Sequence, residues 1–296
     1  MTESSRNPGI LFGPDRKIRL LWRAVIFYLL ADWVLSLALD PAFRFIAGAL
    51  HISDELTAAN GAFWESETFG IALICTAIFA WYEGRRVDSY GLPIDQAFGA
   101  RTWEGALVGV LLAGVVALGM YFLGGMQVRG LQTTGIALAL SALAWLGSNI
   151  CVGLAEELLY RSYLLQTLWK SIGFWPGAVV IALGFAADHY FFKTGENIWD
   201  VITLVSLSLM VSYSVLRTGT LWFAVGFHVA FDYMQFFIIG TPNGALVPQG
   251  PLLDVSFNGP SWLTGGVLGT EASFLMYPAI ALAWLYIWWR YRPPRS

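Results

Sequence analysis

Long runs of apolar residues recur along the chain, each bounded by polar or charged residues, and this alternation predicts a series of membrane-spanning helices. About 20 helical residues cross a hydrocarbon core of about 30 Å. We place the spans at residues 24–39, 69–82, 103–123, 135–160, 175–192, 198–216, 221–239 and 273–289. The second run is short, and an interfacial segment there would change the number of crossings. The predicted fold class is therefore all-α, a polytopic membrane helical bundle of about eight transmembrane helices.

The composition excludes an ordinary soluble domain. Hydrophobic residues make up 57% of the chain and charged residues only 12%, with a mean hydropathy of +0.61, whereas soluble domains carry about 25% charged residues. No basic run suggests a nucleic acid partner, and membrane lipid is the partner that the composition implies. Cys75 and Cys151 lie in apolar runs, where we expect small buried side chains rather than a disulfide.

The placement of lysine and arginine predicts the orientation. If the N-terminus is cytoplasmic and the spans alternate, the basic residues gather on the cytoplasmic side. Only Arg44, Arg129 and Lys193 fall on the other side. We therefore expect a multi-pass protein of the cell inner membrane with both termini cytoplasmic, and a first span that is retained rather than cleaved as a signal peptide.

The chain is predicted to form one membrane domain, because it shows no internal repeat and no coiled-coil heptads. Its parts are a cytoplasmic tail (1–23), N-terminal transmembrane helices (24–134), a core (135–240), an extracytoplasmic loop (241–272), and a last transmembrane helix with a basic tail (273–296). Residues 40–68 form a second long outer loop, with room for a short helix.

The strongest candidate for chemistry is the group Glu156, Glu157 and Arg161 inside an apolar run. An ionisable side chain inside the bilayer costs at least ~2.5 to 3.5 kcal/mol, so these three must be compensated by polar partners or water, or must serve a function. In a helix Glu157 and Arg161 are four residues apart and form an ion pair. Glu156 is rotated away by about 100° and must face another segment of the chain.

Two histidines lie within or at the end of apolar spans. Glu157 and His189 are each 16 residues from Gly173, so a hairpin turn there would place them at similar depth and let Glu156 meet His189. Phe185 precedes His189 by one turn, where it either closes one wall of a pocket or simply packs. The third histidine, His51, lies in a polar loop and is expected to be solvated.

His228 and Asp232 are four residues apart on one helix face, a spacing that fixes an imidazole tautomer or supplies half of a metal site. His228 is only nine residues from the turn at Gly219. Because His189 is 16 residues from its own turn, the two histidines would differ in depth by about 10 Å in straight helices. This difference requires either a hairpin that protrudes into the cytoplasm or a tilted or kinked helix.

The pattern resembles the three motifs of the CPBP family of intramembrane proteases, written EExxxR, FxxxH and HxxxN or HxxxD. That family includes the type II CAAX prenyl endopeptidases, or Ras-converting enzymes, and bacterial relatives linked to bacteriocin processing or immunity. The resemblance covers about residues 135–240, under half of the chain. The chain departs from it at Asp232, where the characterised prenyl endopeptidases carry asparagine, and an aspartate can replace that neutral donor only when it is protonated.

The resemblance implies hydrolysis of a peptide bond in an intramembrane cavity open toward the cytoplasm. Glu156 would be the general base, assisted by His189; His228 with Asp232 would stabilise the oxyanion; and Glu157 with Arg161 would hold the site together. The implied partner is a peptide or prenylated-peptide substrate. Glu156, His189 and His228 also have the ligand types of an open zinc site, but the sequence has no HExxH pair, and we favour a metal-free mechanism over zinc.

Two non-enzymatic alternatives remain open at this point. The first is a membrane scaffold or immunity protein that keeps the fold of a protease but has lost its catalytic activity. Such a protein would be expected to lose motif residues. The second is a transporter with buried charges along its path, which usually has half-repeats and broken helices. The motif residues are present apart from the variation at Asp232, and no repeats are found, so the sequence favours proteolysis.

Overall fold

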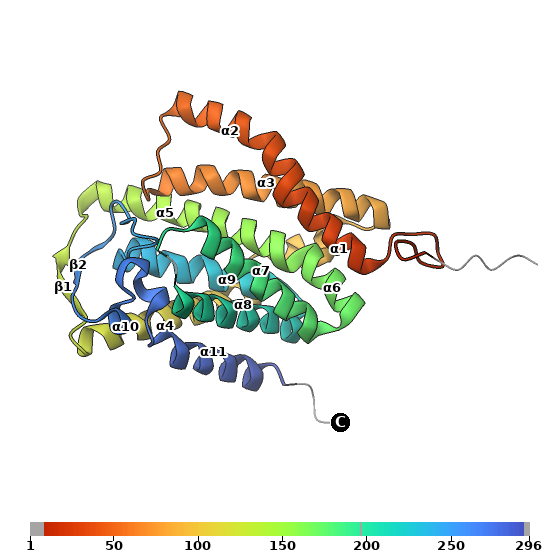
Figure 1. Ribbon diagram of the computed structural model, residues 1–296. Coiled ribbons are helices and arrows are strands. Elements are labelled where there is room, and N and C mark those ends of the chain that lie inside the picture. The colour runs from red at the N-terminus through yellow and green to blue at the C-terminus, as the bar shows by residue number, and fades with distance from the viewer. Residues whose placement is uncertain (1–8, 196, 293–296) are drawn as a thin grey trace, which may run out of the picture.

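The computed structural model describes residues 9–195 and 197–292, which form a bundle of long helices lying side by side (Figure 1). The α-helices are α1 (Leu20–Leu29), α2 (Ser36–Leu50), α3 (Ala58–Glu83), α4 (Ala100–Phe122), α5 (Gly135–Glu156), α6 (Leu165–Ile172), α7 (Phe174–Phe192), α8 (Ile198–Thr218), α9 (Trp222–Asp232), α10 (Ser261–Thr264) and α11 (Met276–Arg290). The π-helical segments are η1 (Leu30–Leu35), η4 (Glu157–Leu164) and η5 (Tyr233–Ile239). The 3-10 segments are η2 (Val87–Tyr90), η3 (Ile94–Gln96) and η6 (Gly266–Ala272).

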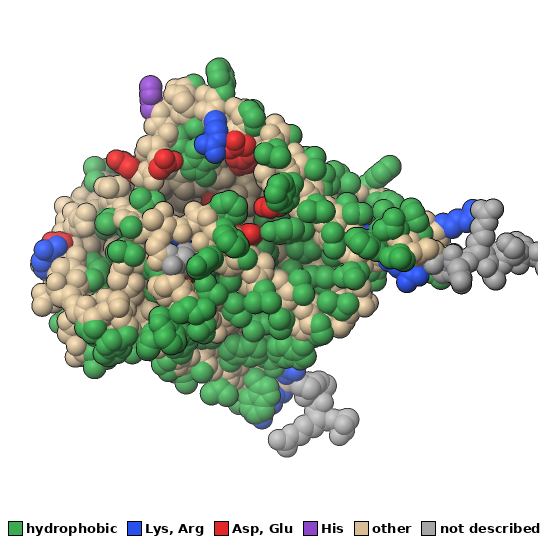
Figure 2. All heavy atoms as spheres, in the orientation of Figure 1, with side chains coloured by type: hydrophobic (Ala, Val, Ile, Leu, Met, Phe, Trp, Pro, Cys, Tyr) green, Lys and Arg blue, Asp and Glu red, His purple; other side chains and the backbone are tan. Residues whose placement is uncertain are grey.

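This architecture confirms the predicted polytopic helical bundle. Within the described residues, seven helical stretches are long and apolar enough to cross a membrane. The remaining expected span is α7, which has 19 residues, carries Asp188 and His189 near its end, and is not one of the seven. Hydrophobic side chains cover much of the visible face, with lysine and arginine mostly near its ends (Figure 2). Parts of both predicted tails, residues 1–8 and 293–296, lie outside the described residues.

The segment 40–68 is not the outer loop that we predicted. Helix α2 continues to Leu50, and α3 already begins at Ala58, where the Thr57 hydroxyl oxygen accepts a hydrogen bond from the backbone N–H of Asn60 at 3.1 Å. The second span is therefore 26 residues long instead of short. The prediction was wrong because Glu65 and Glu67 suggested a solvated loop. In the structure Glu65 lines a cavity, and Glu67 lies near Asp40 and Arg44 of α2.

Two short strands, which the sequence did not predict, close one end of the bundle together with α10 (Figure 1). Strand β1 (Met126–Leu131) pairs antiparallel with β2 (Leu253–Phe257), with Met126 opposite Phe257. The segment predicted as an extracytoplasmic loop, 241–272, therefore contains β2, α10 and η6. These elements tie the C-terminal part of the chain to the connection between α4 and α5.

Close packing of α4 against α9 fixes the helix that carries His228. A Cβ atom added at Gly105 would lie 2.0 Å from the carbonyl oxygen of Phe223, and one at Gly226 would lie 2.0 Å from that of Thr102. No side chain fits at either position, so the two backbones approach directly, as small residues permit in membrane bundles.

The apolar core is divided into two main clusters. The first is formed mainly by α4, α8, α9 and α11, and the second mainly by α1, α3, α6 and α7. Phe227 from the first cluster and Phe185 from the second both line the same cavity. The cavity therefore lies between two packed apolar regions that hold its walls in place.

Candidate active site

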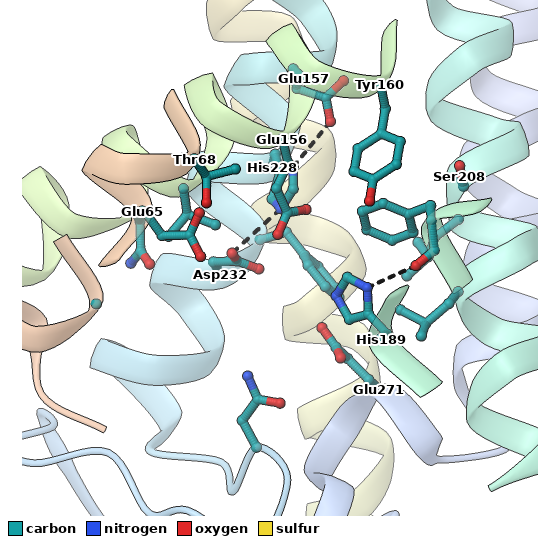
Figure 3. A pocket seen from close by; sticks show the side chains of 18 of the residues that line it. Glu65, Thr68, Glu156, Glu157, Tyr160, His189, Ser208, His228, Asp232 and Glu271 are labelled. Atoms are coloured by element: carbon teal, nitrogen blue, oxygen red, sulfur yellow. Dashed lines mark hydrogen bonds and ion pairs between the residues drawn. The ribbon is translucent and has the colours of Figure 1, made fainter. Parts of the chain in front are cut away.

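A cavity of about 490 Å³ lies between α3, α5, η4, α7, α8 and α9. Every site residue predicted from the sequence lines it, namely Glu156, Glu157, Arg161, Phe185, His189, His228 and Asp232. Five of them are labelled in Figure 3: Glu156, Glu157, His189, His228 and Asp232. Three stretches that are separate along the chain thus meet around one space, which is the arrangement that the motif spacing predicted.

Glu157 and Arg161 form the expected ion pair, and it is buried. Arg161 Nη1 lies 2.6 Å from Glu157 Oε1, and the two side chains are 2% and 1% exposed. Arg161 Nη2 also donates a hydrogen bond to Ser208 Oγ of α8 at 2.8 Å, and its guanidinium lies 5.2 Å from the centre of the Phe185 ring. The pair therefore links η4 to both α7 and α8.

His228 joins this pair through a contact that the sequence did not reveal. Its Nδ1 lies 3.0 Å from Glu157 Oε1, and because a carboxylate oxygen accepts, Nδ1 carries the proton of this hydrogen bond. Its Nε2 lies 3.5 Å from both Glu156 Oε2 and Asp232 Oδ2. Glu156 thus faces another segment, as expected, and Asp232 shares a helix face with His228.

The acids lie where regular α-helix changes to π-helix. Glu156 is the last residue of α5 before η4, and Asp232 is the last residue of α9 before η5. Single π-helical turns inside helices are often found at functional sites. Gly153 allows α9 to approach here, because a Cβ atom on it would lie 2.9 Å from Val229 Cγ2 and 3.5 Å from His228 Cβ.

The depth offset between His189 and His228 has a structural explanation. Helix α5, η4 and α6 form one continuous stretch of 38 residues, about 57 Å at 1.5 Å per residue. This is far longer than a hydrocarbon core of about 30 Å, so the hairpin with α7 extends beyond the span that a bilayer requires. A hairpin that extends at its Gly173 end would account for the distance of His189 from that turn.

His189 is held in one tautomer by its own helix. Its Nδ1 lies 2.9 Å from the Phe185 carbonyl oxygen, which can only accept, so Nδ1 is the donor and Nε2 is left with its lone pair. Figure 3 shows His189 pointing into the cavity between Glu156 and Glu271. Phe185 combines the two roles considered for it, since it lines the cavity and packs 4.4 Å from the His189 ring centre.

Further polar residues line the cavity that the sequence analysis missed. They include Glu65 and Thr68 of α3, Asn149 of α5, Asp188 of α7, and Lys193 and Glu271. Gly61, Glu65 and Thr68 all line it and are spaced four and three residues apart, which is the spacing of one helix face. This spacing would have marked Glu65 and Thr68 as cavity residues if residues 58–68 had been predicted as helix. Glu271, by contrast, lies in a 3-10 segment, where no periodic pattern marks it.

Several of these additional residues pair with one another. Tyr160 and Tyr28 both donate hydrogen bonds from their hydroxyls to Asp188. Lys193 Nζ lies 3.3 Å from Glu271 Oε2, and Gln235 donates to the other oxygen of Glu271 at 3.0 Å. The polar wall of the cavity is therefore built partly from residues outside the three motifs.

The position of the cavity bears on the side from which a substrate arrives. Leu56, Asn243 and Glu271 line it, and all three come from connections that the charge bias places outside the cytoplasm. None of its lining residues within the described chain comes from the connections at the opposite end, 84–99 and 219–221. If the cavity opens through these connections, the orientation predicted from charge places its mouth outside the cytoplasm, opposite to the opening implied by the resemblance.

The residues do not fit the zinc site considered from the sequence. Within residues 9–195 and 197–292, no group of three or more His, Cys, Asp and Glu side chains is arranged to hold a metal ion. Both ring nitrogens of His228 already face carboxylates, and Nδ1 of His189 is bonded to a backbone carbonyl. We therefore derive no catalytic step through a metal.

Comparison with known proteins agrees with the motifs. Residues 137–234 match the model of a family described as type II CAAX prenyl endopeptidase Rce1-like. The match covers about a third of the chain and includes all of the motif residues from Glu156 to Asp232. No match was found among curated proteins. The match supports an intramembrane endopeptidase of the CAAX-protease type in general.

Replacing Arg161 should reveal the cost of the buried pair. We expect Arg161→Met to lower the free energy of unfolding by ~3–5 kcal/mol, because the buried Glu157 loses its guanidinium partner and keeps only the hydrogen bond with His228. The matched control is Arg44→Met, which breaks a pair of the same four-residue spacing with Asp40 whose side chains are 70% and 39% exposed, and should cost about 1 kcal/mol or less. Unfolding in detergent, followed by tryptophan fluorescence, measures both. Equal losses would contradict a structural role for the buried pair.

Proposed function

We propose that this chain, a member of the Rce1-like family of type II CAAX prenyl endopeptidases, hydrolyses a peptide bond within the membrane with a water molecule activated by Glu156. The observation that carries the proposal is the position of the Glu156 carboxylate. Its Oε2 is buried in the cavity and receives no hydrogen bond from any described residue, while His228 Nε2 lies 3.5 Å away. A carboxylate in this state can accept a proton from water.

In the proposed reaction Glu156 takes a proton from water as the water oxygen attacks the peptide carbonyl carbon. Nε2 of His189 assists by accepting the second hydrogen bond of that water, which its fixed tautomer supports. When the tetrahedral intermediate collapses, the C–N bond breaks and the proton on Glu156 passes to the leaving amine nitrogen. The products are a new carboxylate and a new amine.

His228 and Asp232 are proposed to stabilise the oxyanion. The Nδ1 proton of His228 is directed to Glu157, so a second proton is carried on Nε2, which faces the cavity beside Glu156 and Asp232 and can donate to the developing negative charge. Asp232 acts here as a carboxylic acid, since only its protonated form can donate. One positioned donor of this kind contributes ~3 to 4 kcal/mol to transition-state stabilisation. Glu157 and Arg161 hold the imidazole in place.

The substrate is proposed to be a peptide that reaches the cavity from the extracytoplasmic side of the membrane. This side is supported by the charge bias together with the connections that line the cavity. A prenylated peptide is the substrate that the family description suggests. The surrounding lipid is the medium from which a prenyl chain would approach.

Loss of the base should abolish most of the activity. We expect Glu156→Gln and His189→Ala to lower kcat/KM by roughly 10²- to 10⁴-fold, the contribution of a positioned acid–base group. The control is His51→Ala, which removes an exposed histidine far along the chain from the motifs. Cleavage of a prenylated and an unmodified peptide is measured for each purified protein, with metal analysis of the same samples. Equal turnover in parent and variants would remove the catalytic assignment.

The proposed role of protonated Asp232 as a hydrogen-bond donor predicts that kcat depends on pH. In the parent protein kcat should fall as the pH rises and Asp232 loses the proton that it donates. Asp232→Asn supplies a permanent amide donor, so this variant should keep its activity at high pH and lose that alkaline decline. The pH profiles of the two proteins are compared with one peptide. An identical alkaline decline in both would rule out Asp232 as its origin.

The orientation can be tested by thiol labelling. In a background with Cys75→Ala and Cys151→Ala, Asp54→Cys should react with a membrane-impermeant maleimide in intact cells. Asp95→Cys, at another exposed position in the connection between α3 and α4, should react only after the membrane is permeabilised. The reverse labelling pattern would place the cavity on the cytoplasmic side.

A further inference from the structure

Glu65 is an acid in the cavity that the proposed mechanism does not use. It extends from α3 toward Glu156 and Asp232 (Figure 3). Among the described residues we find no hydrogen bond or ion pair to its carboxylate. The basic side chains of Arg161 and Lys193 line the same cavity but are engaged by Glu157 and Glu271. Of the lysine and arginine side chains that line the cavity in the described chain, none is therefore left to pair with Glu65, and a protonated His228 is shared with Glu156, Glu157 and Asp232.

The cavity as a whole carries an excess of acid. Among the described residues, six acidic side chains line it beside Arg161, Lys193 and the two histidines, His189 and His228; the acids are Glu65, Glu156, Glu157, Asp188, Asp232 and Glu271. A carboxylate in a low-dielectric site must be protonated or paired with a positive charge, because a bare charge there is costly. Walls of one sign also raise the local concentration of ligands of the opposite sign.

A second, independent feature beside Glu65 points to a ligand. The Asn149 side chain is 1% exposed and lines the cavity, yet neither of its amide atoms has a hydrogen-bond partner within the described residues. Leaving such a group unsatisfied costs about 1–3 kcal/mol. Its N–H₂ donor and carbonyl acceptor match the C=O and N–H groups of a peptide backbone.

Glu65 and Asn149 belong to helices that touch each other at this depth. Asn149 lies seven residues before Glu156, two turns back on the same face of α5. On α3, Gly61 lies one turn before Glu65, and a Cβ atom added to it would be 2.9 Å from Ser148 Oγ. The carboxylate and the amide therefore approach the same part of the cavity from two adjoining helices.

We propose that Glu65 and Asn149 form a substrate subsite that takes a lysine or arginine side chain of the peptide. Glu65 pairs with the positive charge, and Asn149 binds the peptide backbone beside it. This inference rests on the proposed peptidase function and adds its substrate class, a cationic peptide. Acidic side chains also gather on the visible surface over α2 and α3, where they favour the approach of such a peptide (Figure 2).

The test uses two peptides that differ in one side chain. One carries a single lysine in an otherwise apolar sequence, and the other carries norleucine, which keeps the aliphatic stem without the charge. A series of such pairs moves the lysine along the positions flanking the cleaved bond. We expect the parent to prefer the lysine peptide in kcat/KM by roughly tenfold or more at one position, the range of a charged hydrogen bond. Glu65→Gln should reduce this preference to about one while the norleucine peptide is still cleaved.

Two further variants make the result specific. Glu67→Gln removes an acid from the same helix that does not line the cavity, and it should keep the lysine preference. Asn149→Ala should lower kcat/KM for both peptides by a similar factor and leave their ratio unchanged. A parent without lysine preference, or a Glu65→Gln variant that retains it, overturns the subsite. Unchanged kinetics in Asn149→Ala overturns the role of the amide.

A measurement of peptide binding distinguishes failure of the proposed subsite from failure of the proposed peptidase function. Fluorescence anisotropy with labelled versions of the same peptides reports their affinity for the parent and for Glu65→Gln. If the parent cleaves no peptide, the proposed peptidase function fails, and tighter binding of the lysine peptide that depends on Glu65 still supports the cationic subsite. Equal binding of the two peptides by the parent overturns the subsite whatever the outcome for cleavage.

Discussion

The structure depends on one buried carboxylate that two partners share. Oε1 of Glu157 lies 2.6 Å from Arg161 and 3.0 Å from His228, and the glutamate is fully buried. Charges removed from water are stable only when good geometry and further hydrogen bonds compensate their desolvation, and Arg161 adds such a bond to Ser208. Because these contacts join η4 with α8 and α9, satisfying the charge of Glu157 also fixes the relative position of the helices that surround the cavity.

The way the helices approach follows from local departures from regular helix and from small residues. Glycines let α4 pack backbone to backbone against α9, and Gly153 brings α9 close to α5. The α-helix changes to π-helix directly after Glu156 and Asp232, and both acids line the cavity. A polar cavity inside an apolar bundle is costly, so it persists only because packed apolar clusters on either side hold its walls.

The family match and the cavity do not have the same extent. The match ends at residue 234 and begins at 137, yet Glu65 and Glu271 line the cavity from outside it. The matched segment carries the residues proposed for bond cleavage, and the rest of the chain completes the walls that a substrate would contact.

The sequence by itself determined the helical membrane class, the ion pair of Glu157 with Arg161, and the set of motif residues that line one cavity, because apolar run length and four-residue spacing are local properties of a helix. It failed for residues 40–68, where polar residues on helix faces looked like a loop, and for β1 and β2, whose pairing joins distant parts of the chain. Only the tertiary structure decided that His228 bonds to Glu157 and that Glu65, Asn149 and Glu271 enter the same cavity. These contacts join side chains from different helices, and their distances follow from how the helices pack rather than from any spacing along the chain.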